Sequence, residues 1–354
     1  MDRSGVSYAL AYGANRSGSA VSWLTGWPVT REALLVVGPA PDDDLLFVSY
    51  FNHVPQARRV SVVPAAWTGA SAVATALDAI ASRRRVPDRI GLVGALPFDQ
   101  YRLLTEQVPV VADMNPAYTR LRLVKSAEEL AALQRGAELT DVAIGALADA
   151  LRPGATDHEV LAGTEHAYVS RGGLHQIHYL GITSMDDPVV SVPAQWPTGC
   201  VIRHGDVITC EISVAAAPTT GQVLRTFTVE APAASLFTEL HSVAVAAAFD
   251  AVAARLTPGT RAWDLAEPRP LSSRRPASPP LSAPDFVLSE GMTLVVQPNA
   301  VTGDRRGGVQ TGELLLVTEH GPQRLYACPQ GLQQAGRIAA PGGHARPGPS
   351  PAGC

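Results

Sequence analysis

Short apolar runs separated by turn residues characterise the first third of the chain. Residues 34–37 (Leu-Leu-Val-Val) and 45–48 (Leu-Leu-Phe-Val) flank the turn residues 38–42, and this pattern predicts a pair of strands. Residues 70–83 are rich in alanine with apolar residues at helical spacing, and residues 89–94 then predict a short buried strand. Helices alternating with strands indicate an α/β domain, which we expect over residues 1–118.

Two capping boxes predict the starts of the next helices. Ser126 precedes Glu129 by three residues, and Thr156 precedes Glu159 by three. In such a box the hydroxyl accepts the amide of the third helical residue, and the side chain of that residue accepts the amide of the cap. The dipeptide Pro-Gly at 153–154 is a helix stop. We therefore expect two helices separated by a turn.

The motif Leu-x-Pro-Gly occurs at residues 151–154 and again at 256–259, each time after an alanine-rich stretch. The repeat predicts an internal duplication, while the alternative is that this motif is merely a common helix stop. Strands are predicted after each copy, at residues 207–214, 223–229, 293–296 and 314–317. Two halves of helices followed by strands predict an α+β domain with pseudo-twofold symmetry, which we place at residues 119–326.

Two segments break these patterns. Residues 268–284 are dominated by Arg, Pro, Ser and Ala, and closely spaced prolines exclude both a helix and a strand ladder. Residues 327–354 have too little apolar surface to offset the entropy of ordering, so a disordered tail is predicted. The abrupt change in composition also suggests the hypothesis that this part of the coding sequence is displaced in reading frame.

Composition excludes several classes of function. The chain is 46% hydrophobic and 17% charged with a net charge of −4, so no extended basic surface for nucleic acid or anionic lipid is expected. No signal peptide and no uninterrupted apolar stretch of about 18 residues can be drawn. The four cysteines contain no C-x-x-C pair and suit a reducing compartment. We expect a cytoplasmic protein that contacts neither nucleic acid nor membrane.

Several ordered motifs resemble the pita-bread metallopeptidases of the aminopeptidase P, prolidase and creatinase type. These motifs are Gly-Asp-x-x-x-x-Glu at 205–211, Arg-Thr-Phe at 225–227, Glu-Gly-Met at 290–292, Val-Thr-Glu-His-Gly at 317–321 and Lys-Ser-x-Glu-Glu at 125–129. Together they cover about residues 22–325, and their order makes the resemblance stronger than any single motif. The resemblance implies a creatinase-type N-terminal domain, a pita-bread C-terminal domain and a homodimer.

In catalytic members of this family, two divalent metals are held by two aspartates, one histidine and two glutamates. By the resemblance the first aspartate falls on Glu211 and the second on Gln222, while the glutamates fall on Gln297 and Gly312. Glu313 could replace the last ligand only if the strand register shifted. The histidine strand should lie where the proline-rich segment stands. Because two divalent cations need several anionic oxygens, we predict neither a metal nor another cofactor.

Other candidate residues have both a structural and a functional interpretation. On an extended chain His175 and His178 point to opposite faces, so a hydrogen-bonded or solvated pair is favoured over a metal site, with His178 kept as a candidate proton carrier. Gln310 falls near the lost metal floor with the other two glutamines, and Gln195 stands near the place of a family histidine. These amides would bind an uncharged or amidine-like ligand, or would merely fill the site. For Arg225 a structural role is predicted.

Three functions are compatible with this pattern. The first is metal-independent hydrolysis or binding of a small C–N-bonded substrate, in outline similar to creatinase, with Glu211, His178 and Glu313 as catalytic candidates and Gln222, Gln297, Gln310 and Gln195 as substrate-binding candidates. The second is a non-catalytic pita-bread protein that binds a small molecule or short peptide. The third is an active metal-dependent Xaa-Pro aminopeptidase.

Overall fold

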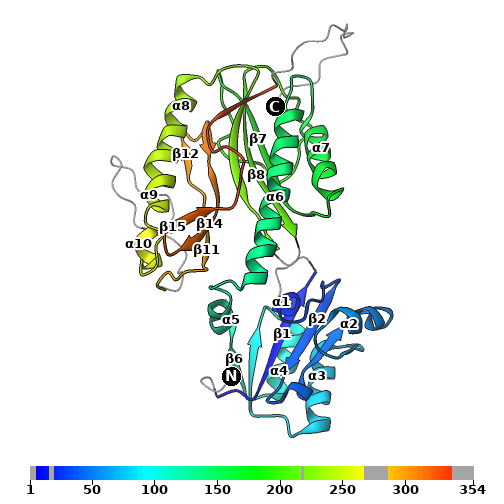
Figure 1. Cartoon of the computed structure of the whole chain (residues 1–354). Coiled ribbons are helices and arrows are strands. Elements are labelled where there is room, and N and C mark those ends of the chain that lie inside the picture. Colours follow the sequence, from blue (N-terminus) through cyan, green and yellow to red (C-terminus); the bar gives the residue numbers. More distant parts are fainter. Residues whose placement is uncertain (1–4, 16–19, 217–218, 267–285, 337–354) are drawn as a thin grey trace. The chain divides into compact units, whose positions relative to one another are not determined.

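A computed structural model of the chain describes residues 5–15, 20–216, 219–266 and 286–336 (Figure 1). The chain forms two compact units, Met1–Leu123 and Val124–Cys354. Two predicted features lie outside the described residues: the irregular segment 268–284 and the part of the tail beyond residue 336. The reading-frame hypothesis concerns these same segments and stays a prediction.

The first unit is built on a six-stranded mixed sheet with the order β4-β3-β2-β1-β5-β6. The predicted strand pair is confirmed, because β2 and β3 are antiparallel with Leu34 opposite Phe47. The strands are β1 Tyr8–Ala14, β2 Glu32–Val37, β3 Leu45–Val48, β4 Ala65–Trp67, β5 Arg89–Val93 and β6 Val110–Asp113. The helices are α1 Ala20–Thr25, α2 Val54–Val60, α3 Ala72–Arg83, α4 Phe98–Gln107 and α5 Asn115–Leu121, with short 3₁₀ turns at Pro41–Asp43 (η2) and Phe51–His53 (η3).

Helices cover both faces of this sheet. On one face Leu77 and Ile80 of α3 and Leu104 of α4 pack against Leu34 and other strand residues. A second buried cluster on the other face joins Val21 of α1 and Ala57 of α2 to the strands. A sheet buried on both sides explains why its strands are continuous apolar runs rather than alternating ones.

The second unit contains an eight-stranded sheet whose main path is β11-β14-β10-β8-β7, with β15, β16 and β9 attached to β14, β10 and β8. Its strands are β7 Leu174–Ser184, β8 Asp206–Ala216, β9 Thr219–Thr220, β10 Val223–Val229, β11 Thr293–Val296, β14 Gly312–Thr318, β15 Gly321–Arg324 and β16 Gln333–Ala335. A separate ribbon pairs β12 Asn299–Val301 with β13 Gly308–Gln310. All four strands predicted for this domain are present.

Figure 1 shows α6 (Ala127–Ala150) and α7 (Asp157–Val169) on one side of this sheet, and α8 (Ser235–Ser242) with α9 (Asp250–Ala253) on the other. The helices α8 and α9 are joined by a π-helical stretch, η4, at Val243–Phe249, and α10 spans Ala262–Ala266. The larger core lies under α6 and α7, where Leu139, Leu147 and Ile212 are buried. A smaller core with Phe237 lies under α8. This α+β layering is the predicted fold class.

Both capping boxes are present as predicted. The Ser126 hydroxyl accepts the amide of Glu129 at 3.2 Å, and the Ser126 amide donates to Glu129 Oε2 at 3.0 Å. Thr156 and Glu159 exchange the same two bonds at 3.2 and 2.8 Å. The local sequence therefore fixes where α6 and α7 begin, because each box satisfies amides that the first helical turn leaves unpaired.

The two Leu-x-Pro-Gly copies have the same hydrogen-bonded setting. The amide of Gly154 donates to Ile202 O at 2.9 Å, and that of Gly259 donates to Leu288 O at 2.9 Å. Both glycines have positive φ angles, of 87° and 92°. Each copy therefore turns the chain out of a helix and against a later extended segment, which supports an internal duplication over two unrelated helix stops.

The first part of the predicted tail is ordered, and that prediction was wrong. Residues 333–335 form β16, which pairs parallel with β10 so that Phe227 lies opposite Gln333. Cys328, earlier in the predicted tail, is buried. Main-chain hydrogen bonds to an available sheet edge stabilise a segment whose side chains alone would not order it.

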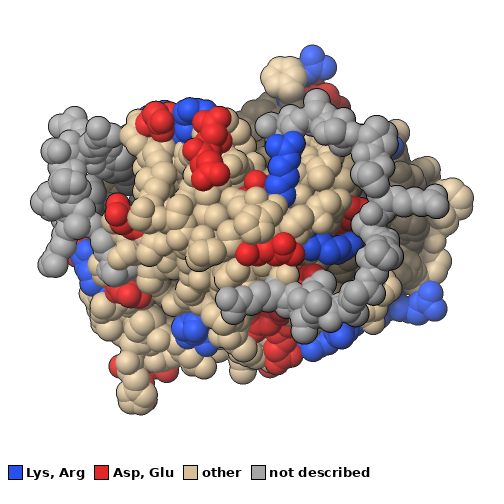
Figure 2. Space-filling model, turned by 90° about the horizontal axis from the view of Figure 1, so that it is seen from above, with Lys and Arg blue, Asp and Glu red and all other residues tan. Residues whose placement is uncertain are grey.

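Two features bear on the exclusions made from composition. On the face seen in Figure 2, acidic and basic side chains are scattered among other residues and form no continuous basic area. The helical stretch Ser235–Ala253 has the length and composition to cross a membrane, with a hydropathy of 1.4. Phe237 and Ala244 of this stretch lie in the core beside the sheet, and 19% of its apolar window is buried.

Candidate functional site

Three side chains meet on one face of the second sheet and form what we call the Glu–Gln–Gln cluster: Glu211, Gln222 and Gln297. Glu211 lies in the middle of β8, Gln222 comes directly before β10, and Gln297 follows β11. The Nε2 of Gln222 donates to Glu211 Oε1 at 2.5 Å and to Gln297 Oε1 at 3.2 Å. The structure thus brings together three residues that the sequence assigned to one site.

The cluster is anchored at Gln222 and open to solvent at Gln297. The main-chain amide of Gln222 donates to the Tyr326 hydroxyl at 2.6 Å, and this bond holds the start of β10 in place. Glu211 and Gln222 are half-buried and Gln297 is exposed. Burial raises the pKa of the Glu211 carboxyl, and the hydrogen bond from Gln222 opposes that rise. Among the described residues, the Nε2 of Gln297 and the Oε2 of Glu211 have no partner and are free for a ligand.

Glu313 lies on the other face of the sheet from Glu211. Leu224 of β10 is opposite both Glu211 and Gly312, whereas the preceding Val223 is opposite Glu313. Residues directly opposite share a face, and consecutive residues alternate. The register shift that Glu313 would need in order to join the cluster is therefore absent.

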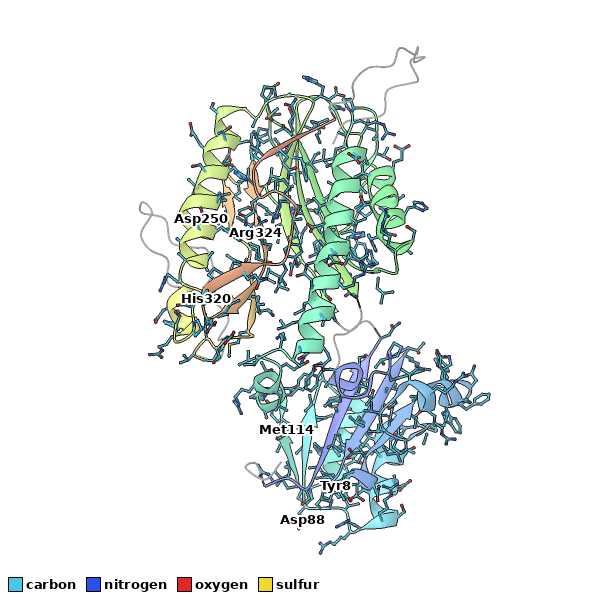
Figure 3. The ribbon with its side chains drawn as sticks, in the orientation of Figure 1. Tyr8, Asp88, Met114, Asp250, His320 and Arg324 are labelled. Carbon is cyan, nitrogen blue, oxygen red and sulfur yellow. The ribbon has the colours of Figure 1, made fainter. Side chains whose placement is uncertain are left out.

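Glu313 instead belongs to a buried ion-pair network. It is fully buried, and Arg225 Nη2 donates to its Oε2 at 2.6 Å. Arg324 donates to the same carboxylate through Nε and, at 2.9 Å, through Nη2; Figure 3 labels Arg324, which ends β15. Arg225 also donates to the carbonyls of Gly312 and Pro329 at 2.8 and 2.6 Å. The predicted structural role of Arg225 is confirmed.

His178 also lies away from the cluster. Its neighbour Tyr179 is opposite Glu211, while His178 is opposite Ile212, which belongs to the core under α6 and α7. The His178 ring packs edge-on against Tyr168 of α7, with ring centroids 5.4 Å apart. A proton carrier on this face cannot exchange protons directly with a ligand at Glu211.

The prediction that His175 and His178 point to opposite faces was wrong. Their ring centroids are only 4.3 Å apart. The strand register shifts between His175 and Ile177, and this bulge inserts one residue that breaks the two-residue alternation of side chains.

The other two glutamines differ in setting. Gln310, in β13, is buried on the cluster side of the sheet, where its amide donates to Thr226 Oγ1 at 2.9 Å and its carbonyl accepts from the same hydroxyl at 2.8 Å. Its side-chain Oε1 is buried without a partner in the described parts of the chain. Gln195 is exposed, and no bond between it and the cluster is present among the described residues.

Comparison with known protein families supports the family resemblance found in the sequence. Residues 131–268 match the sequence profile of metallopeptidase family M24, and residues 1–124 match that of the creatinase/prolidase N-terminal domain. The chain belongs to the pita-bread M24 family. A comparison with curated proteins found no match.

Solved structures of prolidases and Xaa-Pro peptidases share the fold over nearly the whole chain. The prolidase from Pyrococcus horikoshii OT3 is 17% identical with a TM-score of 0.74, covering 94% of this chain and 97% of its own. The X-Pro aminopeptidase from Thermotoga maritima MSB8 is 14% identical with a TM-score of 0.76 and the same coverages. The Xaa-Pro dipeptidase from Bacillus anthracis is 18% identical with a TM-score of 0.72, covering 94% of this chain and 96% of its own.

Two features of the candidate site were not predicted from the sequence. Tyr326 reaches the cluster from a position far along the chain, and nothing in its local sequence signals that contact. The second is the close packing at Gly312, where an added Cβ would lie 2.5 Å from the carbonyl oxygen of Val296. Only the approach of β11 to β14 reveals this restriction.

The raised pKa of Glu211 leads to a test of its environment. A raised folded-state pKa means that the contribution of this carboxyl to stability is present below its ordinary pKa of 4.5 and is lost as pH rises through the higher folded value. Glu211→Gln should therefore gain stability relative to wild type at neutral pH, but not at pH values below 4.5. Urea unfolding at both pH values measures this, and an equal effect at both would show that burial of the charge is not the cause.

Proposed function

We propose that this Xaa-Pro peptidase-like protein binds a small C–N-bonded molecule at the Glu–Gln–Gln cluster, without the metal pair of the family. The observation that carries the proposal is the bond from Gln222 Nε2 to Glu211 Oε1 at 2.5 Å. This bond places an N–H donor against the cluster's one carboxylate, where a metal-binding site would need a second anionic oxygen. The amide is uncharged and leaves Glu211 as the single negative group of the cluster.

The residues present do not fit a dinuclear metal pair. By the family resemblance, three of the carboxylate positions fall on Gln222, Gln297 and Gly312, and neutral amides contribute no charge to offset two divalent cations. Glu313 is on the opposite face and is already neutralised by two arginines. The position expected for the family histidine lies outside the described residues. No step of the proposed function runs through a metal.

The open groups of the cluster define the chemistry of the ligand. Glu211 offers an anionic acceptor, and Gln297 offers an N–H donor beside it. No cationic side chain pairs with Glu211 among the described residues. A planar amidinium group would donate two N–H bonds and balance this charge, and a neutral amide or short peptide would use the same donor and acceptor pair. The buried, unpartnered Oε1 of Gln310 is a further acceptor on this side of the sheet.

Binding is tested by calorimetry with acetamidinium, creatine and Gly-Pro as probes. We expect at least one probe to bind, and Glu211→Gln to weaken an amidinium probe by about tenfold or more, since hydrogen bonds to charged groups are worth about 1.5–3 kcal/mol. Gln323→Ala, an exposed glutamine on β15 outside the cluster, is the matched control and should bind as wild type. Equal affinities in wild type and Glu211→Gln would contradict the proposal.

Metal content provides an independent test. Because the cluster has one carboxylate, the amount of Mn²⁺ or Co²⁺ that depends on Glu211 should be well under one ion per chain. Elemental analysis of wild type and Glu211→Gln after equilibration with each ion measures this difference. A loss of two ions per chain in the variant would support an active metal-dependent Xaa-Pro aminopeptidase instead.

Hydrolysis of the bound molecule is the second candidate, and the raised pKa of Glu211 favours it. A carboxyl whose pKa is moved towards neutrality can both accept and donate a proton. Chelator-treated protein incubated with the bound probe decides between the two: product release indicates a metal-independent hydrolase, and an unchanged probe indicates a binding protein. A cytoplasmic homodimer belongs to the same proposal, and sedimentation over a range of concentrations tests the dimer.

A further inference from the structure

A second group of chemically active side chains lies at the start of β7, on the face away from the Glu–Gln–Gln cluster. Glu165 comes from α7, and His175 and His178 come from β7. Glu165 Oε1 lies 3.1 Å from His175 Nδ1 and 3.2 Å from His178 Nδ1. We call these three residues the Glu–His–His site.

The local chain geometry brings these three ligand atoms together. The turn at residues 170–173 reverses the chain from α7 into β7, which returns past the last turns of the helix. The bulge between His175 and Ile177 then turns both imidazoles to the same side. A regular strand would have placed only one of the two rings near Glu165.

The spacing of the ligand atoms matches that around a small transition-metal ion. Ligand atoms at about 2.0–2.1 Å from a tetrahedral zinc are about 3.3 Å apart. The two observed nitrogen-to-oxygen separations are close to this value, and all three ligand atoms lie within 4.8 Å of one another. Two imidazoles and one carboxylate are a ligand set of catalytic zinc sites, in which a further position is left to water.

Burial also suits a metal ligand. The side chain of His178 is only 2% exposed. The Nε2 of His178 is buried without a partner among the described residues, so Nδ1 is the nitrogen with a polar neighbour. His175 and Glu165 are 48% and 46% exposed, which gives an ion access from solvent.

We infer that Glu165, His175 and His178 bind one divalent transition-metal ion of the zinc class, with water in the remaining position. The ligand types favour Zn²⁺, Co²⁺ or Ni²⁺ over Mg²⁺ and Ca²⁺, which prefer sites made only of oxygen. The inference does not depend on the proposed ligand of the Glu–Gln–Gln cluster, because the two groups lie on opposite faces of the sheet. The competing arrangement is metal-free, with both imidazoles donating a hydrogen bond to Glu165.

Titration of the chelator-treated full chain with Zn²⁺ alone, followed by calorimetry, tests the site. We expect one ion per chain, and a more than about tenfold loss of affinity in His175→Ala and in Glu165→Gln. Mutation of residues that only hydrogen-bond to metal ligands already lowers metal affinity tenfold to a hundredfold. Both changed side chains are about half exposed, so the variants should fold, and circular dichroism checks this. Co²⁺ should give the visible absorption of a tetrahedral nitrogen and oxygen site in wild type but not in His175→Ala or Glu165→Gln.

Two matched variants make the result specific. His166→Ala removes an exposed histidine next to Glu165 on the same helix and should bind Zn²⁺ as wild type. Glu211→Gln should also leave this binding unchanged, which separates the site from the Glu–Gln–Gln cluster. Absence of saturable Zn²⁺ binding, or wild-type affinity in both His175→Ala and Glu165→Gln, would overturn the inference in favour of the metal-free hydrogen-bonded arrangement.

Discussion

Replacing Arg225 by methionine is expected to lower the free energy of unfolding by about 3–5 kcal/mol, the usual cost of removing one partner from a buried ion pair. Arg225 and Glu313 are both fully buried, and their closest atoms are 2.6 Å apart. The variant leaves Glu313 with Arg324 as its remaining cationic partner. The carbonyls of Gly312 and Pro329 also lose the hydrogen bonds that Arg225 donates to them. Urea unfolding measures the loss.

Two further variants separate charge from packing in this network. Arg324→Met should cost clearly less, because the Arg324 side chain is 41% exposed and water can replace it. Arg225→Met combined with Glu313→Leu should recover part of the loss, since no uncompensated charge remains buried. If Arg225→Met unfolds within about 1 kcal/mol of wild type, the network does not support the sheet in the way its geometry indicates.

Gly312→Glu is expected to destabilise the second unit by at least about 1–3 kcal/mol, the usual cost of overpacking. Its Cβ would lie 2.5 Å from the carbonyl oxygen of Val296 and 2.8 Å from the Cα of Gln297. Both are main-chain atoms, so β11 and β14 would have to move apart. Thermal and urea unfolding of Gly312→Glu measure the effect, with Gly331→Ala as the control because no atom lies within 4 Å of an added Cβ there.

The same restriction bears on function. A variant with Gln222→Asp, Gln297→Glu and Gly312→Glu restores the family carboxylates by type, but the third should not reach the cluster without distorting the sheet. We therefore expect no cleavage of Gly-Pro or Ala-Pro by this variant or by the one with only the first two changes, in the presence of Mn²⁺ or Co²⁺. Robust cleavage by either would show that the loss of metal ligands is all that separates this chain from an active peptidase.

Much of the candidate site was predictable because its residues lie on recognisable strands. The motif around Glu211 and the position of Gln222 before Arg225 placed both residues on neighbouring strands, and the structure confirms that they meet. Gln297 was found in the same way. The motifs did not predict that Glu313 and His178 lie on the face away from Glu211, since a shift of one residue moves a side chain to the opposite face of a sheet.

The sequence by itself determined the elements whose causes are local. Capping boxes at Ser126 and Thr156 fix two helix starts, because each depends on hydrogen bonds between residues three apart in the chain. The two copies of Leu-x-Pro-Gly mark the repeat because the motif itself is visible in the sequence. The loss of carboxylates at Gln222 and Gln297 is likewise a fact of the sequence.

Only the tertiary structure decided which faces the side chains share. The bulge in β7 turned His175 and His178 together, the pairing of β10 with β14 put Glu313 beside Arg225, and the free edge of β10 ordered residues 333–335. Each outcome depends on strand register and on a partner distant in the chain. Pairing free energies between distant segments leave no local pattern in the sequence, so these contacts could not be predicted from it.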